Sequence, residues 1–246
     1  MVPLAPETIF HVGKLPVTNT LINTLIVDAV LIGGAFYLRN KLSLIPGYFQ
    51  NLIESIIGFI YNLTESVANE RAMKIFPFFM TFFLFILISN WSGLIPVLTS
   101  IGIYHYGEHG KELIPLVRSA STDLNTTLAL ALVSLTATHA MSITTLGIKE
   151  YLSRFFSLNP LNLFIGLMEL VSEFTKIISF SFRLFGNIYV GEVMLGLLAT
   201  ALAFLAPIPL MLYEVAVGII QAVIFGMLTM AFMAILTTPH HAEGKH

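Results

Sequence analysis

The chain has 246 residues, of which 56% are apolar and only 11% charged, and its formal net charge is −2. This composition lies outside the range of soluble domains and indicates one integral membrane domain over residues 1–246. The near-neutral charge and the absence of a basic run argue against nucleic acid as a partner, and without cysteine there is no disulfide or thiolate metal site.

The N-terminal third of the chain predicts an arm, one span and one surface helix. Residues 1–18 have no compact apolar core behind a basic start, so we expect an arm outside the membrane rather than a cleaved signal. Residues 19–38 reach the roughly 20 apolar residues that a crossing needs, although Asp28 lies midway along them. Residues 47–72 alternate apolar and polar side chains at helical spacing, which predicts an amphipathic helix lying in the membrane interface.

Two further spans are predicted at residues 75–98 and 122–146, joined by a polar loop that ends at Arg118. Asp123 and Asn125 stand at the start of the third span, where such residues often simply cap a helix. We therefore keep a local capping role open for both.

The segment of residues 160–206 is too long for one upright span. A helix over all of it would measure about 70 Å, against a hydrocarbon core of about 30 Å. It either breaks at Gly186 or Gly191 into two spans, or forms one long helix at a steep tilt. Residues 210–238 are also overlong, so we expect a hairpin of two tilted helices with prolines in the turn.

The distribution of lysine and arginine sets the predicted orientation. Seven of these cations fall within residues 39–74, residues 148–159 and the C-terminal tail, against three on the opposite side. The N-terminus is then outside and the C-terminus cytoplasmic, with five crossings, which excludes a break into two spans unless the tail lies outside. The predicted fold is all-α, with five membrane-crossing helices and one interfacial helix.

Arg183 lies deep inside the long segment, about 35 Å along a helix from its nearer end, so its side chain cannot reach water there. Its guanidinium stays charged, and placing it at membrane depth costs at least about 2.5 kcal/mol. Such a cation needs a buried anionic partner or a water-filled cavity. The plain alternative is an arginine that only pins two helices together.

Other polar residues share these two helices with Arg183. Asn187 is one turn away on the same face, and Glu192 is about 13 Å from Arg183 along the axis, on the opposite face. Glu214 and Gln221 share one face of the next helix. These groups could line a water-filled path.

On the inner side of Arg183, Glu169 and Glu173 are four positions apart and could line an exit toward the cytoplasm. Lys176 either balances their charge or anchors the helix at the interface. The histidines, among them His139, are scattered without acidic partners at metal-ligand spacing, so no metal or other cofactor is expected.

The run Arg183-Leu184-Phe185-Gly186-Asn187, followed by Tyr189, Gly191 and Glu192, resembles the signature of the a subunit of F-type ATP synthases. The resemblance extends over most of residues 75–235 through Glu169, Lys176, Ser179, Gly93-Leu94-Ile95-Pro96, Asp123-Leu124-Asn125, Gly147-Ile148-Lys149 and Gln221-Ala222. It implies a stator subunit beside a rotating ring of c subunits, each bearing a membrane-buried carboxylate. It also implies b-type peripheral stalk subunits and the rest of the ATP synthase as partners, in a bacterial plasma membrane.

The resemblance assigns a role to each polar group. Arg183 is the essential barrier between two aqueous half-channels, and Gln221 lies near it. The outer half-channel is lined by Glu192 and Glu214, with the Asp123 and Asn125 motif beside it. The inner one is lined by Glu169, whereas Glu173 has no counterpart in the family pattern.

Two departures from the family pattern concern the outer side. Many relatives have a histidine where this chain has Glu214, so two carboxylates could share one cavity and hold a proton between them. The prolines usual before Asp123 are replaced by Ser119 and Ala120.

Two other classes of protein compete with this interpretation. A secondary transporter also buries charges at the midplane, but it typically has two similar halves, and no internal repeat is present. A scaffold without transport needs no polar lining. No phosphate-binding loop occurs, so the chain is expected to have no active site of its own. Whether the transported ion is a proton or sodium stays open.

Overall fold

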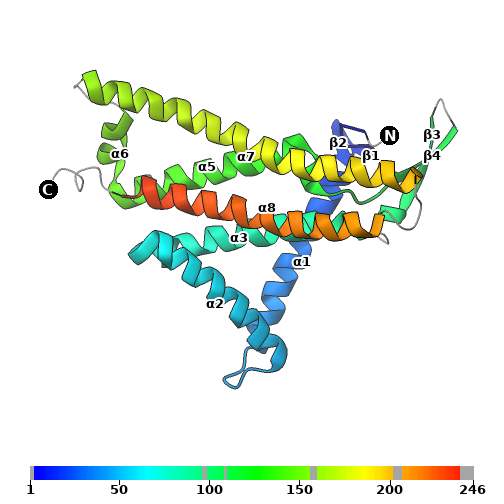
Figure 1. Ribbon diagram of the computed structural model, residues 1–246, viewed down its shortest axis with the longest axis horizontal. Coiled ribbons are helices and arrows are strands. Elements are labelled where there is room, and N and C mark those ends of the chain that lie inside the picture. Colours follow the sequence, from blue (N-terminus) through cyan, green and yellow to red (C-terminus); the bar gives the residue numbers. More distant parts are fainter. Residues whose placement is uncertain (1–2, 96–98, 108–109, 156–159, 202–206, 239–246) are drawn as a thin grey trace.

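The computed structural model describes residues 3–95, 99–107, 110–155, 160–201 and 207–238. Four helices lie alongside one another and form the main bundle (Figure 1): α3 (Ala72–Ser92), α5 (Leu124–Leu146), α7 (Pro160–Ala201) and α8 (Pro207–Leu236). Within it α3 packs mainly on α8, and α5 packs on both α7 and α8.

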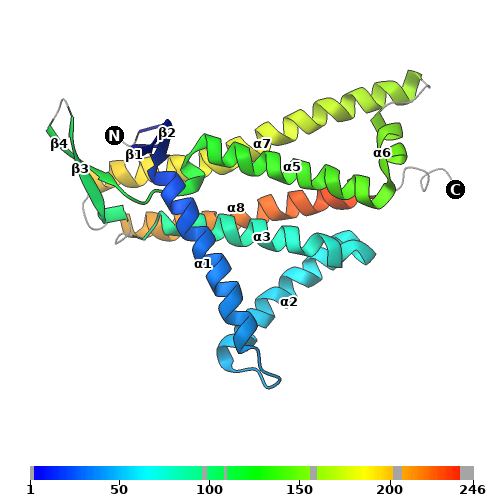
Figure 2. The same cartoon turned by 180° about the vertical axis from the view of Figure 1, so that it is seen from behind.

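Two helices stand away from this bundle. α1 (Asn19–Lys41) begins beside one end of it and diverges, and α2 (Tyr48–Ala68) returns to the opposite end (Figure 2). A short 3-10 turn, η1 (Asn69–Arg71), joins α2 to α3, and Asn69 has a positive φ of 47°. From η1, Arg71 Nη1 donates to Thr238 Oγ1 at 3.1 Å, which ties this corner to the end of α8.

Several predicted elements are confirmed as helices, with shifted ends. The predicted helix 47–72 ends at Ala68, because the backbone at Asn69 is not helical. The predicted span 75–98 is α3, which begins at Ala72 and ends at Ser92. The predicted spans 19–38 and 122–146 correspond to α1 and α5, and α6 (Ile148–Phe155) is an additional short helix.

The long segment is one helix. α7 runs without interruption through Gly186 and Gly191, so the alternative of a break into two spans is wrong. Its 42 residues give a length of about 63 Å. α8 begins at Pro207 rather than at residue 210, because a proline in the first turn lacks only an N–H that would have no helical acceptor.

The all-α expectation missed two β-hairpins. β1 (Thr8–Val12) pairs with β2 (Leu15–Thr18) in the N-terminal arm, around a turn in which Gly13 adopts a φ of 65°. β3 (Gly102–Gly107) pairs with β4 (Gly110–Pro115) within the predicted polar loop.

Four stretches of the described chain are long and apolar enough to cross a membrane: 19–41, 48–92, 124–146 and 207–236. The second includes both α2 and α3, and α7 is not among the four. The predicted number of five crossings therefore stays a prediction, as does the interfacial position of α2. Pro96 and the tail from residue 239, with Lys245, lie outside the described residues.

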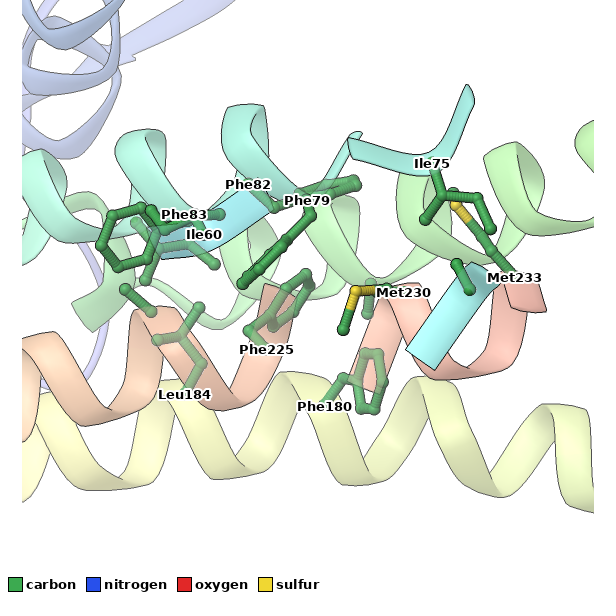
Figure 3. Packing of buried hydrophobic residues seen from close by; sticks show 14 of the residues in the cluster. Ile60, Ile75, Phe79, Phe82, Phe83, Phe180, Leu184, Phe225, Met230 and Met233 are labelled. Carbon is green, nitrogen blue, oxygen red and sulfur yellow. The ribbon is translucent and has the colours of Figure 1, made fainter. Parts of the chain in front are cut away.

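Aromatic side chains fill the contact between α3, α7 and α8 (Figure 3). The ring centroid of Phe225 lies 5.4 Å from that of Phe82 and 5.0 Å from that of Phe180, within the range of favourable aromatic pairs. A Cβ added at Gly226 would overlap the ring of Phe79, so α3 and α8 approach this closely only because residue 226 has no side chain.

Hydroxyl groups join α5 to its neighbours. The Thr127 and Ser181 hydroxyls are 3.1 Å apart, those of Ser134 and Thr229 are 2.7 Å apart, and Ser142 donates to a carbonyl of α8. Small polar residues of this kind allow helices to pack closely inside a membrane. α5 is therefore joined by hydroxyl contacts both to α7 and to α8, the two helices that carry the polar groups.

Candidate functional site

Arg183 lies on an exposed face of α7. Its Nη2 donates to the hydroxyl of Ser179, one turn earlier on the same helix, at 3.1 Å. Within the described part of the chain no carboxylate pairs with it. These residues therefore do not form the alternative arrangement, in which the arginine would join two helices through a carboxylate or carbonyls.

Gln221 of α8 is buried beside Arg183. Both residues line a small void of about 10 Å³ together with Phe180 and Leu184. The two helices thus bring the guanidinium and the amide to one place, as the family resemblance implied. Asn187, one turn from Arg183, is exposed and borders a larger hollow.

Two cavities lie between α3, α7 and α8 toward the end of the bundle that carries the N-terminal arm. The larger has a volume of about 310 Å³, and its wall includes Asn187, Gly191 and Glu214. The smaller, of about 90 Å³, is lined by Arg118, Glu192 and again Glu214. Glu214 therefore borders both cavities.

Glu192 is held by an arginine that the sequence analysis left in a polar loop. Arg118 Nε donates to both carboxylate oxygens of Glu192 at 3.1 Å, and its Nη2 donates to Oε2 at 3.0 Å. The Arg118 side chain is only 4% exposed, against 33% for Glu192. No spacing rule connects the two residues, since they are far apart in sequence.

Arg118 also holds the N-terminal arm. Its Nη2 donates to the carbonyl of Pro3 at 2.9 Å, and its Nη1 donates to that of Ala5 at 3.4 Å. The arm is thereby fixed next to the smaller cavity.

Glu214 is 8% exposed, and its Oε1 has no hydrogen-bond donor within the described chain. The buried Oδ1 of Asn90, which also lines both cavities, lacks a donor from the described residues too. Room for the Glu214 carboxyl group comes from Gly191, because a Cβ there would lie 2.7 Å from Oε1. Buried acceptors of this kind are usually satisfied by water or by a proton.

Asp123 caps α5, which confirms the local alternative. Its Oδ1 accepts from the backbone N–H of Asn125 at 2.9 Å, and its Oδ2 accepts from the Thr20 hydroxyl at 3.4 Å. Asn125 is exposed. Neither Asp123 nor Asn125 lines the two cavities.

The acidic residues of the opposite end of α7 are both paired. Arg154 of α6 donates to Glu169 at 2.6 Å. Lys176 donates to Glu173 at 2.7 Å and lies 4.1 Å from the centroid of the Phe232 ring. Lys176 thus points into the bundle and balances Glu173 but not Glu169, which favours its charge-balancing role over that of an interfacial anchor.

His139, which the sequence analysis left unassigned, lies in this cluster. Its Nε2 is 3.6 Å from Glu173 Oε2, and its Nδ1 is 3.0 Å from the Tyr151 hydroxyl. Burial raises the pKa of Tyr151 above its usual value, and the carboxylates of Glu173 and Glu169 add to this effect. The phenol therefore keeps its proton and can donate it in a hydrogen bond.

Two further observations concern residues away from the two cavities and this cluster. Asp28, half-buried on α1, makes no hydrogen bond or ion pair with the residues that the structure describes. Among those same residues, no three histidine, aspartate or glutamate side chains gather closely enough to hold a metal ion.

Comparison with known proteins shows one consistent family. Residues 20–234 match the family model described as ATP synthase A chain. The chain is 32% identical over 234 residues to ATP synthase subunit a of Moorella thermoacetica, covering 95% of this chain and 97% of the relative. It is 33% identical over 228 residues to ATP synthase subunit a 2 of Pelobacter propionicus, covering 93% and 90% respectively.

Proposed function

Because this chain belongs to the ATP synthase A chain family, and so to the membrane sector of the ATP synthase, we propose that it is the ion-translocating stator. Two aqueous half-channels deliver protons to and from the carboxylates of a rotating c-ring, and Arg183 prevents direct leak between them. Proton flow is thereby coupled to rotation and to ATP synthesis in other subunits. The chain itself needs no active site and no cofactor for this role.

The observation that carries the proposal is an unpaired cation on an apolar surface. Arg183 is exposed on α7, where neighbouring Ile178 and Phe182 are more than half exposed. A guanidinium in an apolar environment needs an anion. Since no carboxylate of the described chain provides one, we infer that a carboxylate of another chain, the c-ring, does.

A fixed cation also explains how leak is prevented. Arg183 favours the ionised form of a passing ring carboxylate, and it repels a proton that would cross without rotation. The driving force is about 2.3 kcal/mol per charge per 100 mV. Arginine suits this position better than lysine, because lysine can lose its proton at such depth.

The outer half-channel is supported by the two cavities beside α7 and α8. Glu192 borders the smaller cavity, Glu214 borders both, and Asn187 borders the larger one next to Arg183. We propose that protons enter from outside through these two cavities, with Gln221 positioned beside Arg183 at the inner end. Asp123 and Asn125 contribute by fixing the start of α5.

The inner half-channel is proposed at the opposite end of α7. Glu169 and Glu173 lie there with Arg154, Lys176 and His139, in a cluster of alternating charge. In this arrangement the N-terminal arm faces outside and the end of α8 faces the cytoplasm. The crossings are α1, α3, α5, α7 and α8, and α2 lies in the interface.

The test is ATP-driven acidification in membrane vesicles that carry the assembled complex, with passive proton leak measured alongside. Arg183→Ala should abolish pumping while the complex stays assembled, with leak unchanged or raised. Arg39→Ala, which removes an exposed cation at the end of α1, is the matched control and should pump normally. Pumping that survives Arg183→Ala would show that Arg183 is structural.

A further inference from the structure

We propose that the two carboxylates of the outer cavities have different roles: Glu214 carries the translocated proton, whereas Glu192 and Arg118 form a fixed ion pair that positions the cavity wall. This inference rests on the proposed function, because it divides the work within the outer half-channel. It also replaces the expectation that the two carboxylates share one proton.

The contacts of Glu192 favour its charged carboxylate. Both of its carboxylate oxygens accept guanidinium N–H groups from Arg118, through three hydrogen bonds of 3.0–3.1 Å. Paired, charge-assisted bonds of this geometry are the strongest that a carboxylate makes with a side chain. A proton on Glu192 would weaken these bonds and leave the guanidinium charge unbalanced.

Arg118 is not free to release Glu192. Its side chain is 4% exposed and is fixed on its other side by the carbonyls of Pro3 and Ala5. Arginine also cannot lose its own proton in exchange. The pair therefore joins the N-terminal arm to α7 as a permanent structural link at the smaller cavity.

Glu214 has the opposite properties. Its Oε1 is buried without a donor from the described chain, and the carboxyl group borders both cavities. It thus stands between the cavity next to Arg118 and the cavity next to Asn187, and so between the outside and Arg183. A buried acceptor without a partner is where a proton or water molecule is expected to bind.

The proposed step is a transfer of protons only. A proton from water on the outer side forms an O–H bond at Glu214 Oε1. That bond breaks when the proton leaves through the larger cavity for a ring carboxylate beside Asn187 and Arg183. Glu214 returns to the carboxylate, and the Arg118–Glu192 pair keeps its charges throughout.

A double-mutant cycle in the assembled complex separates these roles, with proton flow in vesicles as the readout. Arg118→Gln and Glu192→Gln should each lower flow about tenfold, because each leaves the other charge without its partner. The double variant should regain most of this loss. Glu214→Gln should stop flow in the wild-type and in the double-variant background.

Two results would overturn the division of roles: a double variant as slow as Glu192→Gln alone, or flow that survives Glu214→Gln. If the double variant does not assemble, the charge-swapped Arg118→Glu/Glu192→Arg variant decides in the same way. The controls are Arg39→Gln, which removes an exposed positive charge as Arg118→Gln removes a buried one, and Glu65→Gln, which removes an exposed negative charge as Glu192→Gln does at the cavity. The two proposals can fail separately. If Arg183→Ala abolishes pumping but the Arg118→Gln/Glu192→Gln double variant regains no proton flow, this inference is refuted and the proposed function stands.

Discussion

Gly191→Ala displaces the Glu214 carboxyl group without removing it. A Cβ at residue 191 would lie 2.7 Å from Oε1 and 3.0 Å from Cδ of Glu214. Favourable heavy-atom contacts are about 3.5–4.0 Å, so the carboxyl group must retreat by roughly 1 Å. The clash falls on the end of a flexible side chain beside a cavity of about 310 Å³, so the helices can stay in place.

The expected result of Gly191→Ala is a complex that assembles normally and conducts poorly. Alanine in a helix interior is more favourable than glycine by about 0.5–1 kcal/mol, so α7 should not weaken. A reacting group displaced by about 1 Å can lower a rate by up to about a hundredfold, and we expect a loss of proton flow between tenfold and that limit. The assay is ATP-driven acidification in vesicles, compared with Gly34→Ala, where the added Cβ meets nothing within 4 Å.

A second variant tests the cause of the loss. Glu214→Asp shortens the side chain by one carbon–carbon bond, about 1.5 Å, which withdraws the carboxyl group from the new methyl group. Gly191→Ala with Glu214→Asp should therefore conduct better than Gly191→Ala alone. Normal flow in Gly191→Ala, or no gain in the combined variant, would refute the placement of Glu214 against α7.

Three further predictions concern stability, each measured by thermal unfolding of the assembled complex. Gly226→Val forces a side chain against the ring of Phe79 and should destabilise by about 1–3 kcal/mol; an unchanged midpoint would mean that α3 and α8 pack less closely. Lys176→Met removes the lysine that donates to the buried Glu173 and leaves His139, 3.6 Å away, as its nearest basic side chain, so it should lower stability, and adding Glu173→Gln should restore part of it. Asp123→Ala removes a helix cap and should cost about 1 kcal/mol while flow persists; abolished flow in a stable complex would place Asp123 in the ion path.

The helices and the central cation could be predicted because both depend on local patterns. Apolar runs of sufficient length predict α1, α3, α5 and α8, and the family resemblance implied the meeting of Arg183 with Gln221. Helix ends were less predictable, since they depend on single backbone conformations such as that of Asn69.

The partners of the acidic groups could not be predicted from spacing. Arg118 lies in a connection and reaches Glu192 only because the chain returns through α5 and α7. His139 meets Glu173 across two helices in the same way. The hairpin of residues 8–18 was missed because it is short and its turn has only one glycine, Gly13. Side-chain pairings over such distances follow from the assembled bundle and leave no periodic signal.

Two arginine contacts determine whether the number of membrane crossings between certain residues is even or odd. Arg118 binds the carbonyls of Pro3 and Ala5, so the chain between them must cross an even number of times. Arg71 binds Thr238, so the same holds between residues 71 and 238. Arg71 and Arg118 lie beyond opposite ends of α3.

If α3 crosses once, the arm and the end of α8 are therefore on opposite sides, and the total must be odd. The four apolar stretches would give an even number of crossings if each crossed once, whereas α7 as an additional crossing would make the number odd. Because the chain has no cysteine of its own, single cysteines placed at residues 5 and 238 would report the two sides to an impermeant thiol reagent without background.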